Sequence, residues 1–158
     1  MILDVGCGSF HKGDVNCDLF IKDAGHRLQE GKSINVKNIK NFVLCDSKFL
    51  PFRNSSFDVV YSSHVIEHVP EPVKVLDEMV RVSSSQVELL CPHWLGDKLG
   101  GKNPYHLSKF RVKWFAAYAK NRQLFCRCRI TRYFDTKKGF GIVRLLRIPH
   151  EIHVLFGK

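Results

Sequence analysis

The first 92 residues contain five short apolar segments, each followed by residues that commonly end a strand. The segments cover residues 1–5, 15–20, 41–45, 57–62 and 86–91. Between the last two, residues 71–82 carry apolar side chains at helical spacing, with Pro72 suited to a first helical turn. A short helix is also expected near 34–40. Short strands that alternate with helices predict an α/β chain built on a mainly parallel sheet.

The second half of the chain continues this pattern less regularly. Residues 94–110 contain three glycines and are predicted to form a loop that can wall a substrate site. A helix is expected over 110–119. Two strands are expected after it, over 124–133 and 142–156, the second bent at Pro149.

The length and composition fit a single domain over residues 1–158. With 158 residues and 44% hydrophobic side chains, the chain can bury one sizeable core. We divide it into a cofactor-binding half, 1–92, and a basic substrate-side half, 93–158. Because the sequence has neither an apolar run long enough for a membrane span nor a secretory leader, we expect a cytoplasmic protein.

Positive charge is concentrated in the second half. Residues 1–90 hold ten Lys and Arg against twelve acidic residues, whereas residues 91–158 hold fifteen against three. This asymmetry predicts a surface over residues 98–147 that contacts an anion, although a solvated basic face explains the charge equally well. Nucleic acid, a nucleotide, a phosphorylated metabolite and an anionic membrane face all remain open as the anion.

Aromatic residues lie among these basic residues. The basic residues are Lys98, Lys102, Lys109, Arg111, Lys113, Arg127, Arg129, Lys137, Lys138, Arg144 and Arg147. Trp94, Tyr105, Trp114 and Phe115 are interleaved with the first of them, as in sites that stack a base beside a phosphate. Core packing explains Trp114 and Phe115 at least as well. On alternating strand positions, Arg127 would share a face with Arg129.

Six cysteines lie mostly inside apolar, strand-like segments. They occupy positions 7, 17, 45, 91, 126 and 128. This distribution is typical of reduced core thiols. Zinc at Cys126 and Cys128 is the alternative, but two thiolates on one strand face leave two ligands missing.

A glycine turn joins the first two apolar segments, and acidic residues end the second and third. Gly6 and Gly8 let the backbone turn sharply and approach a ligand. Ligands of α/β sheets bind outside the carboxyl ends of strands, where Asp18 can accept hydrogen bonds from ribose hydroxyls and Asp46 from an adenine amino group. His11 stands where the dehydrogenase fingerprint requires a third glycine, which disfavours that class.

In combination these residues resemble the class I superfamily of S-adenosylmethionine-dependent methyltransferases, particularly its small methyltransferase-domain branch with a shortened first helix. The resemblance rests on Leu3-Asp-Val-Gly-Cys-Gly8, on Asp46 with Leu50-Pro-Phe52, and on the segment 57–69. It covers residues 1–92, and residues 103–110 resemble the segment before the family's last helix. It implies a Rossmann-like, mainly parallel seven-stranded sheet with helices on both faces and an antiparallel C-terminal strand.

The resemblance also implies S-adenosylmethionine as the cofactor, together with the residues that bind it. The set is Asp4, Gly6, Cys7, Gly8, Asp18, Leu19, Asp46, Ser47, Ser63 and His64. The glycine turn is expected around the methionine part and Asp18 at the ribose. Asp46 and Ser47 are expected at the adenine. Ser63 and His64 are expected near the sulfonium.

The sequence departs from the family pattern around the first turn. Phe10 replaces a frequent third glycine, and only nine residues separate Gly8 from Asp18, too few for the usual first helix. The N-terminal helices that often cover the substrate do not precede the first strand. We therefore expect a second copy or a partner chain to cover the site.

Histidines are the candidates for acid–base chemistry. Methyl transfer requires alignment and exclusion of water more than a fixed catalytic group, and a base helps only when the acceptor loses a proton. His64, His93 and His106 are the candidates, although backbone-bonded or solvated loop histidines are the plainer interpretation of the last two. His64 and His68 lie four residues apart without a third ligand, so no metal site is expected. In the family, Glu67 and His68 are structural.

The sequence predicts transfer of a methyl group from S-adenosylmethionine to an unidentified, anionic acceptor such as RNA, a nucleotide or a phosphorylated metabolite. Ser62-Ser-His-Val65 stands where enzymes that methylate amino groups of bases carry an Asn-Pro-Pro-Tyr motif, which argues against that route. The alternative is a non-catalytic binding module that retains the fold and serves a partner protein or nucleic acid.

Overall fold

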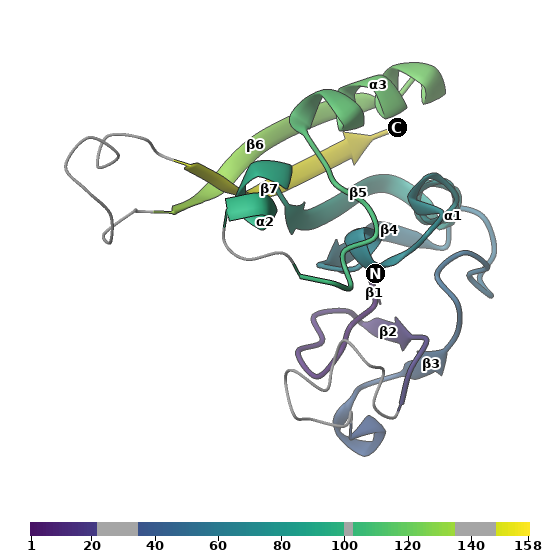
Figure 1. The fold of residues 1–158 in the computed structure, drawn as a ribbon. Helices are drawn as coiled ribbons and strands as arrows, with labels where there is room; N and C mark the ends of the chain where they lie inside the picture. The colour runs from purple at the N-terminus through teal and green to yellow at the C-terminus, as the bar shows by residue number, and fades with distance from the viewer. Residues whose placement is uncertain (22–34, 100–102, 135–147) are drawn as a thin grey trace.

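The computed structural model describes residues 1–21, 35–99, 103–134 and 148–158 (Figure 1). Its strands are β1 (Ile2–Val5), β2 (Val15–Asp18), β3 (Phe42–Leu44), β4 (Phe57–Ser63), β5 (Ser83–Pro92), β6 (Phe125–Phe134) and β7 (Ile148–Gly157). Its helices are η1 (Val36–Asn38), η2 (Ile66–His68), α1 (Pro72–Val82), α2 (Trp94–Leu99) and α3 (Val112–Arg122). No helix within these ranges is both long and apolar enough to cross a membrane.

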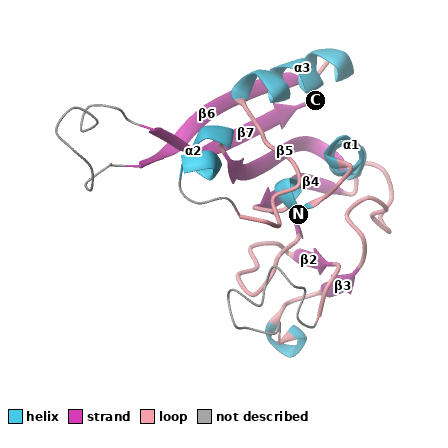
Figure 2. Ribbon diagram, in the orientation of Figure 1, coloured by secondary structure: helices cyan, strands magenta, loops and turns pink. Residues whose placement is uncertain are grey.

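The strands form one seven-stranded sheet in the order β3-β2-β1-β4-β5-β7-β6 (Figure 2). β1 pairs in parallel with both β2 and β4, and β7 runs antiparallel between β5 and β6. The predicted Rossmann-like, mainly parallel sheet with an antiparallel C-terminal strand is therefore confirmed. Strand order reverses between β1 and β4, which is the position where ligands of such sheets bind.

One face of the sheet is apolar and carries both long helices. On β5 and β7 its paired buried residues are Val87 and Phe156, Leu89 and Val154, and Cys91 and Ile152. Asp77 of α1 accepts hydrogen bonds from Tyr118 (2.8 Å) and Arg122 (3.0 and 2.8 Å) of α3, so the two helices lie side by side. Phe115 of α3 is fully buried in the same cluster. Helices were expected on both faces of the sheet, and α1 and α3 both lie on this apolar face.

The opposite face of the sheet is polar. Asp4 of β1 lies beside Asn16 and Tyr61, and both neighbours are buried. Towards the other edge, His153 of β7 accepts a hydrogen bond at Nδ1 from Arg129 (3.1 Å). The strand register places Arg127 and Arg129 on this same face, as the alternation predicted.

Several element boundaries differ from the predicted ones for identifiable reasons. β2 ends at Asp18 rather than at residue 20, because Asp18 accepts a hydrogen bond from Phe20 N (3.0 Å) and turns the chain. Residues 94–99 form α2 inside the predicted loop. A Cβ on Gly96 would lie 2.7 Å from His150 Cα, so the glycine lets this short helix pack closely on β7. Residues 142–147 of the predicted last strand lie outside the described ranges.

Candidate functional site

The predicted cofactor residues gather at the carboxyl ends of the parallel strands, which we call the carboxyl edge (Figure 1). Residues 6–8 follow β1, and Asp46 and Ser47 follow β3. Asp18 ends β2 and Leu19 follows it, and Ser63 ends β4 and His64 follows it. Asp4 lies within β1, two residues before Gly6. The topology therefore brings together residues that are up to 60 positions apart in the chain.

The glycine turn is bonded to the end of β2. Gly6 N and Cys7 N both donate to Cys17 O, at 2.8 and 3.0 Å, and Gly8 N donates to Asp18 Oδ2 at 3.0 Å. Asp18 is 5% exposed. Its carboxylate thus fixes the turn after β1 as well as the turn after β2, and stands at the point predicted for a ribose.

The two glycines of the turn serve different purposes. Both have positive φ, 72° at Gly6 and 53° at Gly8. A Cβ on Gly6 would lie 2.2 Å from Val65 Cγ2, in the turn after β4, whereas a Cβ on Gly8 would meet no atom within 4 Å. Gly6 therefore makes room for Val65. Gly8 leaves its backbone open to a ligand, which fits the approach of the methionine part.

Asp4 is a buried carboxyl group beneath the turn. It is 2% exposed and accepts a hydrogen bond from Lys12 N at 2.8 Å. Burial raises the pKa of Asp4 to about 6, although the Lys12 N–H opposes the rise. Lys12 Nζ also donates to Tyr61 Oη at 2.9 Å, which joins the turn to β4.

The predicted adenine side carries exposed apolar side chains. Asp46 Oδ1 accepts a hydrogen bond from Lys48 N at 2.8 Å, which holds the carboxylate in the turn after β3. β2 and β3 pair Asp18 with Leu44, so Leu19 and Leu44 lie at neighbouring strand ends, 47% and 55% exposed. An apolar surface beside an acidic side chain suits a purine ring with an exocyclic amino group.

His64 is held between two buried carboxylates. Its φ is 55°, and its backbone N donates to Leu90 O at 2.9 Å. The ring lies 3.2 Å from Glu67 Oε1 at Nδ1 and 3.1 Å from Glu151 Oε2 at Nε2. The hydrogen bond to Glu67 raises the pKa of His64 against the opposing effect of burial, and Glu151 adds to the rise. The arrangement favours an imidazolium.

His93 and His106 lie in different surroundings. His93 is 9% exposed, and its Nδ1 accepts a hydrogen bond from Leu95 N at 3.3 Å. Burial lowers the pKa of His93, and the charge of Arg111 adds to this effect. His106 donates from Nδ1 to Asp97 Oδ1 at 2.6 Å and packs edge-on against His68. His93 is thus bonded to backbone, whereas His106 belongs to a cluster that reaches Glu67 and His64.

Two acidic residues of this site were not identified from the sequence. Glu151 comes from β7 and reaches His64 because β7 pairs antiparallel with β5. Asp97 comes from α2, which was expected to be loop. Neither residue belongs to a local sequence motif, so only the arrangement of the strands and helices could have identified them.

The basic residues of the substrate-side half are mostly exposed beside the carboxyl edge. Lys98, Lys109 and Lys113 are exposed, and the Arg111 guanidinium lies 4.0 Å from the centre of the Trp94 ring. Trp114 instead packs against Phe110 in the core, with ring centroids 4.9 Å apart. Lys102, Lys137, Lys138, Arg144 and Arg147 lie outside the described ranges.

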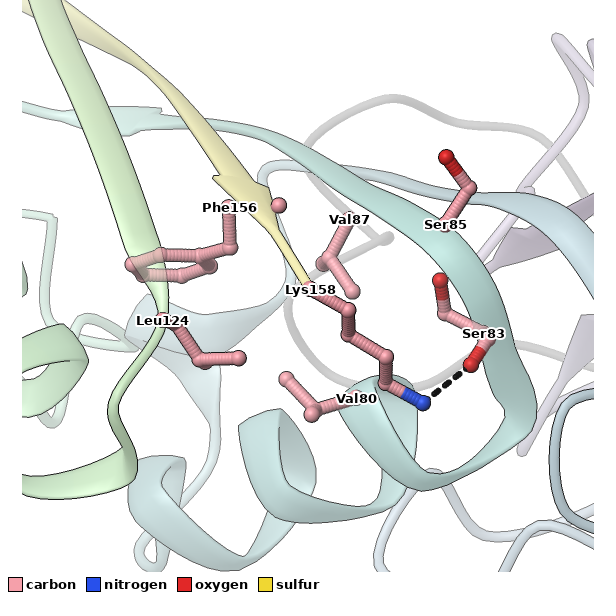
Figure 3. Close-up of a pocket in the computed structure, with 8 residues that line it drawn as sticks. Val80, Ser83, Ser85, Val87, Leu124, Phe156 and Lys158 are labelled. Atoms are coloured by element: carbon pink, nitrogen blue, oxygen red, sulfur yellow. Dashed lines mark hydrogen bonds between the residues drawn. The ribbon is translucent and has the colours of Figure 1, made fainter.

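A hollow at the other end of the sheet is separate from this site (Figure 3). It is lined by Val80, Ser83, Ser85, Val87, Leu124, Phe156, Gly157 and Lys158. Lys158 Nζ donates to Ser83 O across it. The hollow lies where β5 begins and β7 ends, opposite the carboxyl edge.

Comparisons with known proteins agree with the geometry of the carboxyl edge. A family model described as a methyltransferase domain matches residues 3–91. An uncharacterized methyltransferase of Mycobacterium leprae is 31% identical over 103 residues, which cover 61% of this chain and 38% of that protein. The chain therefore spans less than half the length of that relative.

Solved structures share the fold at low sequence identity. A S-adenosylmethionine-dependent methyltransferase from Archaeoglobus fulgidus superposes with a TM-score of 0.70 and 16% identity, over 99% of this chain and 85% of that one. A chain from a complex between the Haloferax volcanii Trm112 methyltransferase activator and a methyltransferase superposes with a TM-score of 0.66 and 13% identity. The superposition covers 99% of this chain and 80% of that one. The chain therefore belongs to the methyltransferase domain family of the class I S-adenosylmethionine-dependent methyltransferases, whose cofactor is S-adenosylmethionine.

Proposed function

We propose that this protein transfers a methyl group from S-adenosylmethionine to an anionic acceptor, such as RNA, a nucleotide or a phosphorylated metabolite. The observation that carries the proposal is that an exposed basic segment lies beside the carboxyl edge. Leu107 N and Ser108 N donate to Glu67 O, which ties the basic segment 103–113 to η2, directly after β4 at the carboxyl edge. A cationic surface beside the methyl donor would concentrate and orient a negatively charged acceptor.

The cofactor residues have distinct roles in this proposal. S-adenosylmethionine supplies an activated methyl group on a sulfonium. Gly8 and Cys7 would approach the methionine part, and Asp18 the ribose. Asp46, with Ser47 beside it, would accept from the adenine amino group. Ser63 would lie near the methyl group.

The histidines near the acceptor would position it more than deprotonate it. His64 has both ring nitrogens bonded to carboxylates, and the hydrogen bond to Glu67 raises its pKa. His93 has its Nδ1 engaged by Leu95 N. Because an in-line displacement at a sulfonium mainly needs alignment, histidines whose ring nitrogens are already engaged are consistent with the chemistry.

Calorimetric titration of the purified chain with S-adenosylmethionine and S-adenosylhomocysteine tests the cofactor site. We expect micromolar binding, weakened about tenfold to a hundredfold by Asp18→Ala, because the carboxylate makes charge-assisted hydrogen bonds. Asp58→Ala is the matched control, since Asp58 is exposed at the opposite end of β4. Equal loss in both variants, or no binding by the wild-type chain, would contradict this assignment.

Charge reversal tests the acceptor class. We expect the double variant Lys109→Glu and Arg111→Glu to lower methyl transfer to an anionic acceptor about tenfold or more, with unchanged cofactor affinity, because both side chains are exposed beside the carboxyl edge. Radiolabelled transfer to RNA, nucleotides and phosphorylated metabolites, compared at low and high salt, measures the effect. Lys120→Glu is the control, because Lys120 is exposed near the C-terminal end of α3. Transfer that is insensitive to both salt and charge reversal would exclude an anionic acceptor.

The second candidate function is a non-catalytic module that serves a partner protein. One structural neighbour stands in a complex with the Trm112 methyltransferase activator, and exposed Leu19 and Leu44 offer an apolar contact at the carboxyl edge. A second copy of this chain could cover the same surface. A stable complex or dimer seen by sedimentation, without methyl transfer in the presence or absence of the partner, would favour this function.

A further inference from the structure

Three metal-ligating side chains converge next to the methyl-transfer edge. Glu67 and His68 belong to η2, directly after β4, and His106 belongs to the segment between α2 and α3. One ligand atom from each residue lies within 4.8 Å of the others. His106 is 38 positions from His68 and 39 from Glu67 along the chain, so the fold and not a local motif brings it to them.

Both imidazoles are oriented as those of metal-binding histidines are. His68 Nδ1 lies 3.0 Å from Tyr105 O, and His106 Nδ1 lies 2.6 Å from Asp97 Oδ1. Metal-binding histidines usually donate one ring N–H to a backbone carbonyl or a carboxylate, which turns the other nitrogen towards the ion. Here that nitrogen is Nε2, and Nε2 of His68 lies 4.0 Å from Glu67 Oε1.

The Glu67 carboxylate supplies an independent indication of a missing cation. Glu67 is 1% exposed, and its Oε2 has no hydrogen-bond partner among the described residues. A buried carboxylate oxygen without a partner is costly and rare in native proteins. A bound cation would satisfy it.

The backbone holds the cluster in place before any ion binds. Leu107 N and Ser108 N donate to Glu67 O, at 2.7 and 3.1 Å, so the segment that carries His106 is tied to η2. Asp97 N donates to His93 O at 3.0 Å, which fixes the residue that orients His106. His68 and His106 are partly exposed, so an ion can reach them.

We propose that Glu67, His68 and His106 bind one divalent transition-metal ion of the Zn²⁺ type. Two imidazole nitrogens and one carboxylate oxygen form a ligand set that suits zinc, and a fourth position remains for water or an acceptor oxygen. Zinc–ligand distances of about 2.0–2.2 Å require the three ligand atoms to approach one another more closely than 4.8 Å when the ion binds. The proposal does not depend on methyl transfer.

Zinc titration of the metal-free protein, by calorimetry and by competition with a chelator, tests the site. We expect one equivalent with micromolar or tighter affinity. His106→Gln should weaken binding about a hundredfold or more, and Asp97→Asn about 10–100-fold through loss of the orienting hydrogen bond. Substitution with Co²⁺ should give the visible absorption of nitrogen and oxygen ligands without a thiolate charge-transfer band.

A cysteine variant provides the matched control. Cys126 and Cys128, with sulfur atoms 3.4 Å apart, are a described pair of thiols that could also hold zinc. The double variant Cys126→Ser and Cys128→Ser should keep full affinity. Absence of stoichiometric binding, loss in the cysteine variant, or binding unchanged by both His106→Gln and Asp97→Asn in folded protein would overturn the proposal.

Discussion

Replacing Gly6 with alanine is expected to abolish cofactor binding and to lower the free energy of unfolding by about 2–5 kcal/mol. The new Cβ would lie 2.2 Å from Val65 Cγ2, and the residue would keep a φ of 72°. Overpacking typically costs about 1–3 kcal/mol and a left-handed non-glycine residue about 1–2 kcal/mol. Urea unfolding and calorimetry with S-adenosylmethionine measure the two effects.

Two further variants separate these causes. Gly8→Ala has the same backbone cost, at a φ of 53°, but no atom within 4 Å of its new Cβ, so only about 1–2 kcal/mol should be lost. Adding Val65→Ala to Gly6→Ala should recover the overpacking part. Equal destabilisation by the two glycine variants, without recovery by Val65→Ala, would show that the contact with Val65 is unimportant.

Asp4→Asn is expected to make the cofactor-free protein more stable at pH 7, by up to about 3 kcal/mol. The pKa of Asp4 is raised from 3.8 to about 6, so the folded state binds its proton more tightly than the unfolded state does. The stability that protonated Asp4 contributes is therefore complete below about pH 4 and is lost as the pH rises to about 6. An asparagine can still accept the hydrogen bond from Lys12 N and never ionises.

Urea unfolding from pH 4 to pH 8 measures this prediction. The variant and the wild type should have similar stability near pH 4 and separate above it. Asp14→Asn is the control, because Asp14 also accepts a backbone hydrogen bond, from Ile2 N at 2.9 Å, but is exposed to water. A constant difference between Asp4→Asn and wild type across the range would show that Asp4 does not ionise in this window.

The positions of the glycine turn and of Asp18 at the strand ends could be predicted because they depend on short, local stretches of sequence. Gly6, Gly8 and Asp18 lie within 13 residues of one another, and each is placed by the strand next to it. Glycine requirements and strand-end positions follow from backbone geometry that a short segment determines. The fold class followed from the same periodicity, and the antiparallel last strand from the family resemblance.

The surroundings of His64 and the helix α2 could not be predicted to the same depth. The carboxylate that contacts His64 Nε2 is supplied by Glu151, 87 residues away, and nothing near either residue indicates the pairing. Gly96 suggested a loop, whereas its missing Cβ allows α2 to contact β7. Each of these depends on tertiary contacts that override local propensity.

The strand order also determines when the sheet can be completed during synthesis of the protein. β7, synthesised after β6, lies between β5 and β6, so β6 has no sheet neighbour until the last strand emerges. Glu151 arrives with that strand, so the environment of His64 is completed only after β7 has been synthesised. A nascent chain that has exposed β1 to β5 therefore presents the glycine turn and the acidic strand ends before Glu151 can contact His64. Completion of the sheet then depends on long-range strand pairing, which is intrinsically slow.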